Sequence, residues 1–120
     1  MDKVAAIKEL TDLFKECNTL NWDGYNANSV TAEHYNIALK VLESLHPNLP
    51  PPFFCADPYG CICFEWYRDK KNLVTFSVEL SSSLIYLAVI GDKTWSGIAE
   101  FGTEFPPLLQ DLIEKVIKED

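Results

Sequence analysis

An alternating segment occupies residues 53–90, FFCADPYGCICFEWYRDKKNLVTFSVELSSSLIYLAVI, in which apolar and polar side chains follow one another for much of its length. A period of two is typical of β-strands that bury one face. The pattern predicts four strands, at residues 53–57, 61–67, 73–80 and 84–90. A weaker pattern at 95–101 is compatible with a fifth strand.

The connections between these strands are short. Asp57-Pro58-Tyr59-Gly60 has the residue order of a type I turn followed by a position that favours glycine. Such a turn predicts a three-residue hairpin in which Asp57 pairs with Cys61 and Cys55 lies opposite Cys63. Short turns favour sequential antiparallel pairing, which makes a meander.

Helical spacing flanks the sheet segment on both sides. Apolar residues recur every three or four positions in 3–17, in the segment from Thr31 to His46-Pro47, and in 106–118. Thr31 is a suitable N-cap for the second helix, and the proline at 47 is expected to end it.

The order of elements predicts an α+β fold: an antiparallel meander of about four to five strands with three helices packed mainly on one face. The segment 84–90 is apolar on both faces, which indicates a central strand or one that is covered from both sides. The length of 120 residues predicts one globular domain, residues 1–120.

The chain is acidic, with 10 Lys and Arg against 18 Asp and Glu and a net charge of −8. This balance argues against nucleic-acid and anionic-membrane partners, which need a basic surface. The N-terminus lacks the apolar run of a secretory signal, and no segment is apolar for long enough to span a bilayer. We therefore expect a cytoplasmic protein with free thiols and no cofactor.

Three of the four cysteines are expected on one face of the first hairpin: Cys55, Cys61 and Cys63. Three thiolates can bind zinc. However, the C-x-C spacing has no second matching pair, and His34 and His46 lie beyond the proline-rich link. We therefore interpret these cysteines as small hydrophobic residues on the outer face of the sheet rather than as metal ligands.

The loop between the first two helices contains Trp22-Asp23-Gly24-Tyr25. Large aromatic residues in a loop are compatible with a recognition site. The favoured interpretation is structural: Trp22 and Tyr25 fill the gap between the helices and the sheet, while Asp23 binds backbone amides.

The loop W-D-G-Y-N-A at 22–27, a helix capped at Thr31, a proline-rich link and the strand G-x-I-x-x-E-W at 60–66 resemble a group of small bacterial and phage-associated proteins. The resemblance covers about residues 20–80. It implies a fold and an association with mobile elements, and no mechanism. A proline that the pattern has before the second helix is replaced here by Ser29, and the cysteines are not part of the pattern.

Catalytic signatures are absent from the sequence. Glu65 and Glu79 are expected on the same face of neighbouring strands and could form a carboxylate pair, but no His, Lys or Arg is paired with them by spacing. No nucleophile elbow, zinc-protease motif or phosphate loop occurs. The sequence therefore favours a protein that is not an enzyme.

The main hypothesis is a small acidic protein-binding module that neutralises another protein with a basic surface, as an immunity protein, an antitoxin or a phage-encoded anti-defence protein would. A scaffold homodimer that pairs through an open sheet face is the alternative, and an enzyme with an unrecognised site is the third possibility. The candidate binding residues are Trp22, Asp23, Tyr25, Glu65, Tyr67, Glu79, Tyr86, Glu100 and Glu104.

Overall fold

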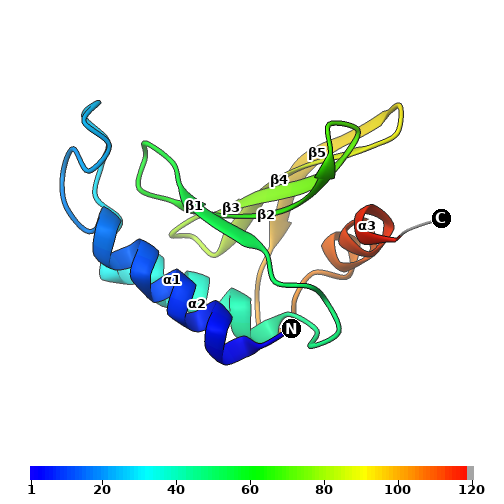
Figure 1. The fold of residues 1–120 in the computed structure, drawn as a ribbon, viewed down its shortest axis with the longest axis horizontal. Helices are drawn as coiled ribbons and strands as arrows, with labels where there is room; N and C mark the ends of the chain where they lie inside the picture. Colours follow the sequence, from blue (N-terminus) through cyan, green and yellow to red (C-terminus); the bar gives the residue numbers. More distant parts are fainter. Residues whose placement is uncertain (119–120) are drawn as a thin grey trace.

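The computed structural model describes residues 1–118 and has an α+β arrangement (Figure 1). The five strands pair antiparallel in chain order, so the predicted meander and its fifth strand are confirmed. The helices are α1 (Lys3–Cys17), α2 (Ala32–Ser44) and α3 (Pro107–Ile117). The strands are β1 (Phe53–Ala56), β2 (Ile62–Asp69), β3 (Asn72–Val78), β4 (Ser83–Ile90) and β5 (Lys93–Glu100).

The three helices lie on one side of the sheet, as the sequence predicts (Figure 1). α1 and α2 pack against each other; α1 also contacts β1, and α2 contacts β2 and β3. α3 covers the other part of the same face, where it contacts β2, β3 and β4. Within residues 1–118, the opposite side of the sheet carries no helix (Figure 1). Among the described residues, no helix is long and apolar enough to cross a membrane.

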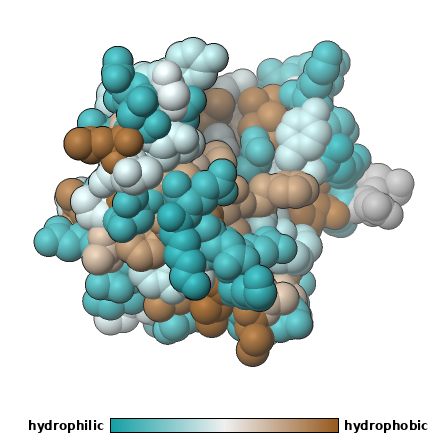
Figure 2. All heavy atoms as spheres, turned by 60° about the vertical axis from the view of Figure 1, so that its left-hand side comes forward, coloured by the Kyte–Doolittle hydropathy of each residue, from teal (hydrophilic) through white to brown (hydrophobic). Residues whose placement is uncertain are grey.

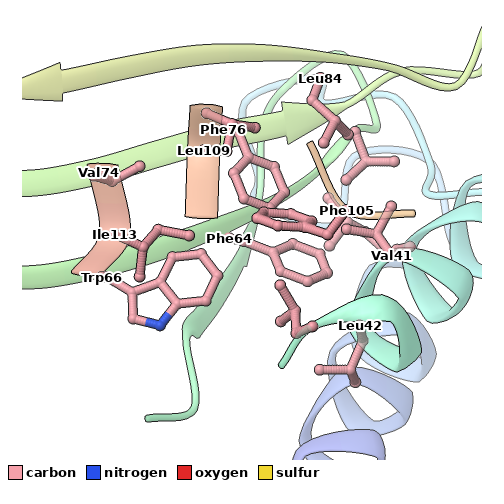
Figure 3. Packing of buried hydrophobic residues seen from close by; sticks show 14 of the residues in the cluster. Val41, Leu42, Phe64, Trp66, Val74, Phe76, Leu84, Phe105, Leu109 and Ile113 are labelled. Carbon is pink, nitrogen blue, oxygen red and sulfur yellow. The ribbon is translucent and has the colours of Figure 1, made fainter. Parts of the chain in front are cut away.

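The core forms between the sheet and the helices, around stacked aromatic rings (Figure 3). The rings of Phe64 and Phe76 lie 5.0 Å apart between centroids, and Phe105 approaches Phe76 at 5.8 Å. Val41 and Leu42 of α2 and Leu109 and Ile113 of α3 close this cluster from the helix side (Figure 3). Phe64 and Phe76 both point toward the helices because every second residue of a strand lies on the same face of the sheet.

Side chains form hydrogen bonds with the free backbone groups at both ends of α2. The Thr31 side chain accepts a hydrogen bond from the amide of His34, so the predicted cap of α2 is confirmed. At the other end of α2, the Lys3 ammonium donates to the carbonyls of Leu42, Glu43 and Leu45 at 2.9–3.0 Å. A cation is favourable there because the last carbonyls of a helix carry partial negative charge.

β4 occupies an internal position between β3 and β5. Leu84 and Ala88 are fully buried, whereas Ile85 and Leu87, on the opposite face, are 45% and 40% exposed. Of the two predicted explanations for the apolar character of this strand, the central position is therefore confirmed, and cover from both sides is wrong.

Candidate functional site

The side of the sheet that faces away from the helices, which we call the outer face, is not covered by any helix among residues 1–118 (Figure 1). Alternate residues of each strand form it because the strand period is two. None of its residues is Lys or Arg. The register between strands places these side chains on it: Phe53, Cys55, Asp57, Cys61, Cys63, Glu65, Tyr67, Leu73, Thr75, Ser77, Glu79, Ser83, Ile85, Leu87, Val89, Thr94, Ser96, Ile98 and Glu100.

Five outer-face residues form one line across the sheet, from the end of β1 to the end of β5. We call this line the acidic row; it consists of Asp57, Cys61, Glu79, Ser83 and Glu100. It extends for about 19 Å, since neighbouring strands are about 4.8 Å apart. The row therefore holds three carboxylates, with one strand between each carboxylate and the next.

Hydrogen bonds join the members of the acidic row. The amide of Asp57 donates to the carbonyl of Cys61 at 2.9 Å, and the Cys61 thiol donates to Glu79 Oε2 at 2.7 Å. The amide of Glu79 donates to the carbonyl of Ser83 at 2.9 Å, and Ser83 Oγ donates to Glu100 Oε1 at 3.0 Å. The two side-chain contacts orient the carboxylates of Glu79 and Glu100, and the Asp57 carboxylate is oriented by the amides of Tyr59 and Cys61, which donate to it at 3.0 Å.

No carboxylate of the acidic row has a cationic partner within residues 1–118. The ion pairs of this region of the chain lie elsewhere, at Lys8–Asp12, Arg68–Asp69 and Lys115–Asp111. Lysines 70, 71 and 93 lie at the turns between β2 and β3 and between β4 and β5, at the opposite end of the strands. Asp69 and Asp92 lie at the same turns as these lysines, so the end of the strands opposite the acidic row carries charges of both signs.

Exposed aliphatic side chains lie directly beside the acidic row. Ile85, Leu87 and Ile98 are 45%, 40% and 66% exposed, and Ile85 pairs with Ile98 across β4 and β5. We call these three residues the aliphatic patch. Tyr67 and Phe53 add exposed aromatic area near the far end of β2. Apolar area bordered by charge is typical of protein-binding surfaces.

The cysteines of the first hairpin lie as the turn chemistry predicts. Asp57 pairs with Cys61, and Cys55 lies directly opposite Cys63. A hydrogen bond from the Cys63 thiol lowers the pKa of Cys55 to about 7, against the opposing effects of burial and of the Glu65 and Asp57 carboxylates. The same contact, together with burial, raises the pKa of Cys63.

Cys61 has a different environment. Burial, the hydrogen bond to Glu79 and the Asp57 charge raise the pKa of this thiol to about 12. In the described part of the chain, no group of three or more His, Cys, Asp and Glu side chains is placed to hold a metal ion. The zinc alternative for Cys55, Cys61 and Cys63 therefore has no geometric support.

The loop between α1 and α2 is tightly folded. The Asp23 carboxylate accepts hydrogen bonds from the amides of Tyr25 and Ala27 at 2.8 and 3.2 Å, as predicted. Trp22 packs against the core and donates its indole hydrogen to the carbonyl of Asn28 at 2.9 Å. Tyr25 is 87% exposed, so the prediction that it fills a gap in the interior is wrong.

This loop docks on the tip of the β1–β2 hairpin. The amide of Asn28 donates to the carbonyl of Pro58 at 2.8 Å. Gly60 has a φ of +89°, and a Cβ atom there would lie 2.6 Å from the carbonyl oxygen of Ser29. Figure 2 brings this side of the molecule forward and shows mostly hydrophilic atoms, with hydrophobic atoms in small separate groups.

The structure separates several of the predicted site residues. Tyr86, a candidate binding residue, pairs with Phe76 and lies on the helix-facing side of β4, packed against the core, so it does not share the outer face with Tyr67. Glu65 and Glu79 share the outer face but lie four residues apart along the register, about 13 Å, so they form no carboxylate pair. Glu104 lies on the helix side, in a groove that Ser44 and His46 also line.

Sequence reasoning missed Asp57 as a member of the acidic row and Ile98 as a member of the aliphatic patch. The hairpin signal pairs Asp57 with Cys61, and continuing that register across β3 would have placed Asp57 in line with Glu79. Glu65 and Tyr67 do share a site: both line a groove of about 210 Å³ with Phe53 and Arg68.

Comparisons with known proteins do not extend this description. No protein-family model, no curated protein and no solved structure matches the chain.

Proposed function

We propose that the protein is a small acidic binding module that neutralises another protein by docking its outer face on a basic surface. The observation that carries the proposal is the acidic row beside the aliphatic patch: three carboxylates without cationic partners, next to three exposed aliphatic side chains. Charge guides the approach of a cationic partner, and desolvated apolar area holds it.

The free energies expected from ion pairs and from apolar burial give the acidic row and the aliphatic patch different roles. An exposed ion pair contributes about 0.2–1 kcal/mol, and salt screens it. Full burial of an exposed aliphatic side chain is worth about 1.5–3 kcal/mol, so half-exposed Ile85, Leu87 and Ile98 can each supply about 1 kcal/mol. The carboxylates thus govern mainly the association rate, while the aliphatic patch governs mainly the lifetime of the complex.

Site-specific photocrosslinking in cells tests this proposal. A photoreactive amino acid at Ile85 reports on the outer face, and the same amino acid at Val4, which is 79% exposed on α1, reports on the helix side. We expect a crosslinked protein with a basic surface from Ile85 and not from Val4. Equal crosslinking from both positions, or none from Ile85, would contradict docking through the outer face.

A charge-matched pair of variants then tests the acidic row with the purified partner. Glu79→Lys combined with Glu100→Lys reverses two charges of the row, whereas Glu9→Lys combined with Glu16→Lys makes the same charge change on α1. We expect the first variant alone to lose binding and to restore the partner's activity. If both variants bind equally, net charge rather than the acidic row drives association.

The free edge of β5 favours a second candidate, a structural homodimer. β5 pairs with no strand except β4 among those described, and it has eight residues without a proline. Unpaired backbone groups on a long edge strand can pair with another strand. Light scattering after size-exclusion chromatography tests this: a dimer that Ile98→Lys dissociates supports the scaffold function, and a monomer at millimolar concentration removes it.

A further inference from the structure

Cys55 and Cys63 differ from the other cysteines in that each faces a second thiol. They occupy directly opposite positions on β1 and β2, with Cys55 exposed and Cys63 half-buried. Directly opposite residues of an antiparallel pair have Cα atoms about 4.5–5.5 Å apart. Asp57 and Cys61 form a hydrogen-bonded pair, so Cys55 and Cys63 form the next one, with Cα atoms about 5.5 Å apart. Disulfides bridge Cα atoms about 4.4–6.8 Å apart, so this separation is within reach, and closure draws the two Cβ atoms slightly together.

The remaining thiols have no such neighbour. Cys17 is buried in α1, and Cys61 lies one row further along the sheet, where its thiol is hydrogen-bonded to Glu79. Two positions along a strand correspond to about 7 Å, and the residues across from Cys61 are Asp57 and Glu79. The fold therefore selects one pair out of four cysteines.

We propose that Cys55 and Cys63 form a dithiol site that exchanges with low-molecular-weight disulfides and closes into a reversible cross-strand disulfide. Cys55 is the attacking sulfur because it is exposed, and Cys63 is the resolving sulfur because it lies behind it on β2. The pKa directions of the pair agree with this order: the neighbouring Cys63 side chain lowers the pKa of Cys55, whereas Cys55 and burial raise the pKa of Cys63.

The exchange proceeds in two balanced steps. The Cys55 thiolate attacks one sulfur of the small disulfide; a bond forms between these two sulfurs, the original S–S bond breaks, and one half leaves as a thiolate. Cys63 then gives its proton to water and attacks Cys55 Sγ, which releases the second half as a thiolate. The two protein thiols are oxidised to a disulfide, and the small disulfide is reduced to two thiols.

The acidic surroundings affect which reagent can approach. Asp57 Oδ2 lies 4.0 Å from Cys63 Sγ, and Glu65 is the next outer-face residue along β2. These carboxylates repel anionic disulfides such as oxidised glutathione at low salt. An uncharged probe, hydroxyethyl disulfide, therefore measures the intrinsic reactivity of the pair.

The product would alter the edge of the sheet. β1 has only four residues and, in the part of the chain that the structure describes, pairs only with β2. A covalent bond in the middle of this short pairing holds β1 in register, which we expect to slow amide exchange at residues 55 and 57, whose amides face β2. The site goes beyond the proposed binding function, and its chemistry does not depend on any protein partner.

Treatment of the full chain with hydroxyethyl disulfide, followed by peptide mass spectrometry, tests the proposal. We expect the wild-type protein and the control Cys61→Ser to lose two hydrogens and to yield a linked Cys55–Cys63 peptide, with Cys17 still reduced. The variant Cys63→Ser should stop at a stable mixed disulfide on Cys55, which the wild type does not accumulate. Dithiothreitol should restore both thiols.

Three results would overturn the proposal. The first is a stable mixed disulfide on Cys55 in the wild-type protein, because the resolving step would then be blocked. The second is a linkage that includes Cys61 or Cys17. The third is absence of any reaction at Cys55 under conditions that modify a small-molecule thiol.

Discussion

The thiol of Cys61 donates a hydrogen bond to the carboxylate of Glu79, with 2.7 Å between Sγ and Oε2, and so links the beginning of β2 to the end of β3 on the outer face. Neither residue has a cationic partner among those described. The contact places a carboxylate in the middle of the acidic row and keeps the neighbouring thiol protonated. It also gives the outer-face cysteines distinct reactivities.

We predict that alkylation by iodoacetamide distinguishes Cys55 from Cys61 by pH. The Cys55 rate should rise through a midpoint near pH 7, because the hydrogen bond from Cys63 lowers its pKa to about 7. Cys61 should stay unreactive until the pH approaches 12, its raised pKa. Peptide mass spectrometry of a pH series measures both rates. Similar profiles for the two thiols would show that the contacts described here do not control their ionisation.

Glu79→Gln should make Cys61 ionise at lower pH than in the wild type, since the change removes both the negative charge and the carboxylate acceptor.

Cys61 also makes the stability of the fold depend on alkaline pH. The folded-state pKa of Cys61, about 12, lies above the ordinary value of 9.0. Its contribution to the free energy of unfolding is therefore complete below pH 9.0 and is lost as the pH rises toward 12. Denaturant unfolding between these pH values measures the loss, which Cys61→Ser should reduce.

Gly60→Ala should destabilise the fold more than Gly24→Ala. The two glycines have similar φ values, +89° and +79°, so the backbone strain is alike, about 1–2 kcal/mol. Only at Gly60 does a Cβ meet another segment, the carbonyl oxygen of Ser29 at 2.6 Å. Urea unfolding of both variants measures the difference, which we expect to exceed about 1 kcal/mol. Equal losses would mean that the loop and the hairpin separate easily.

Lys3→Met should lower the free energy of unfolding by about 1–2 kcal/mol, because three carbonyls at the end of α2 lose a charged donor. Lys8→Met is the control: it removes a lysine from the same helix whose only partner is the exposed carboxylate of Asp12. The control should change stability far less. Thermal unfolding at low and high salt would show whether the Lys3 contacts, being partly buried, resist screening.

For the complex with a captured partner, we predict that charge and apolar variants affect different rate constants. Glu100→Lys should slow association several-fold at low salt and lose this effect at high salt. Ile98→Ser should instead speed dissociation, about fivefold for each 1 kcal/mol of lost apolar contact. Surface plasmon resonance separates the two constants. A dissociation rate that is indifferent to Ile98 would exclude the aliphatic patch from the interface.

Local patterns in the sequence determined the secondary structure, the chain order of the meander and the hairpin register. Alternation, cap residues and the Asp57–Gly60 turn involve only a few neighbouring residues each, so short segments are enough to predict them. The same reasoning placed Cys55 opposite Cys63 correctly. It also placed the apolar stripes of all three helices against one face of the sheet.

Only the tertiary structure decided which side chains of β4 and of the loop between α1 and α2 are exposed to solvent. Both faces of 84–90 are apolar, so alternation offers no preference, and the pairing of Tyr86 with Phe76 determines which face is buried. The exposure of Tyr25 depends on how its loop docks on Pro58, a contact between residues far apart in the chain. The acidic row likewise exists only because the register of four strand pairs aligns residues from 57 to 100, and no short segment encodes that alignment.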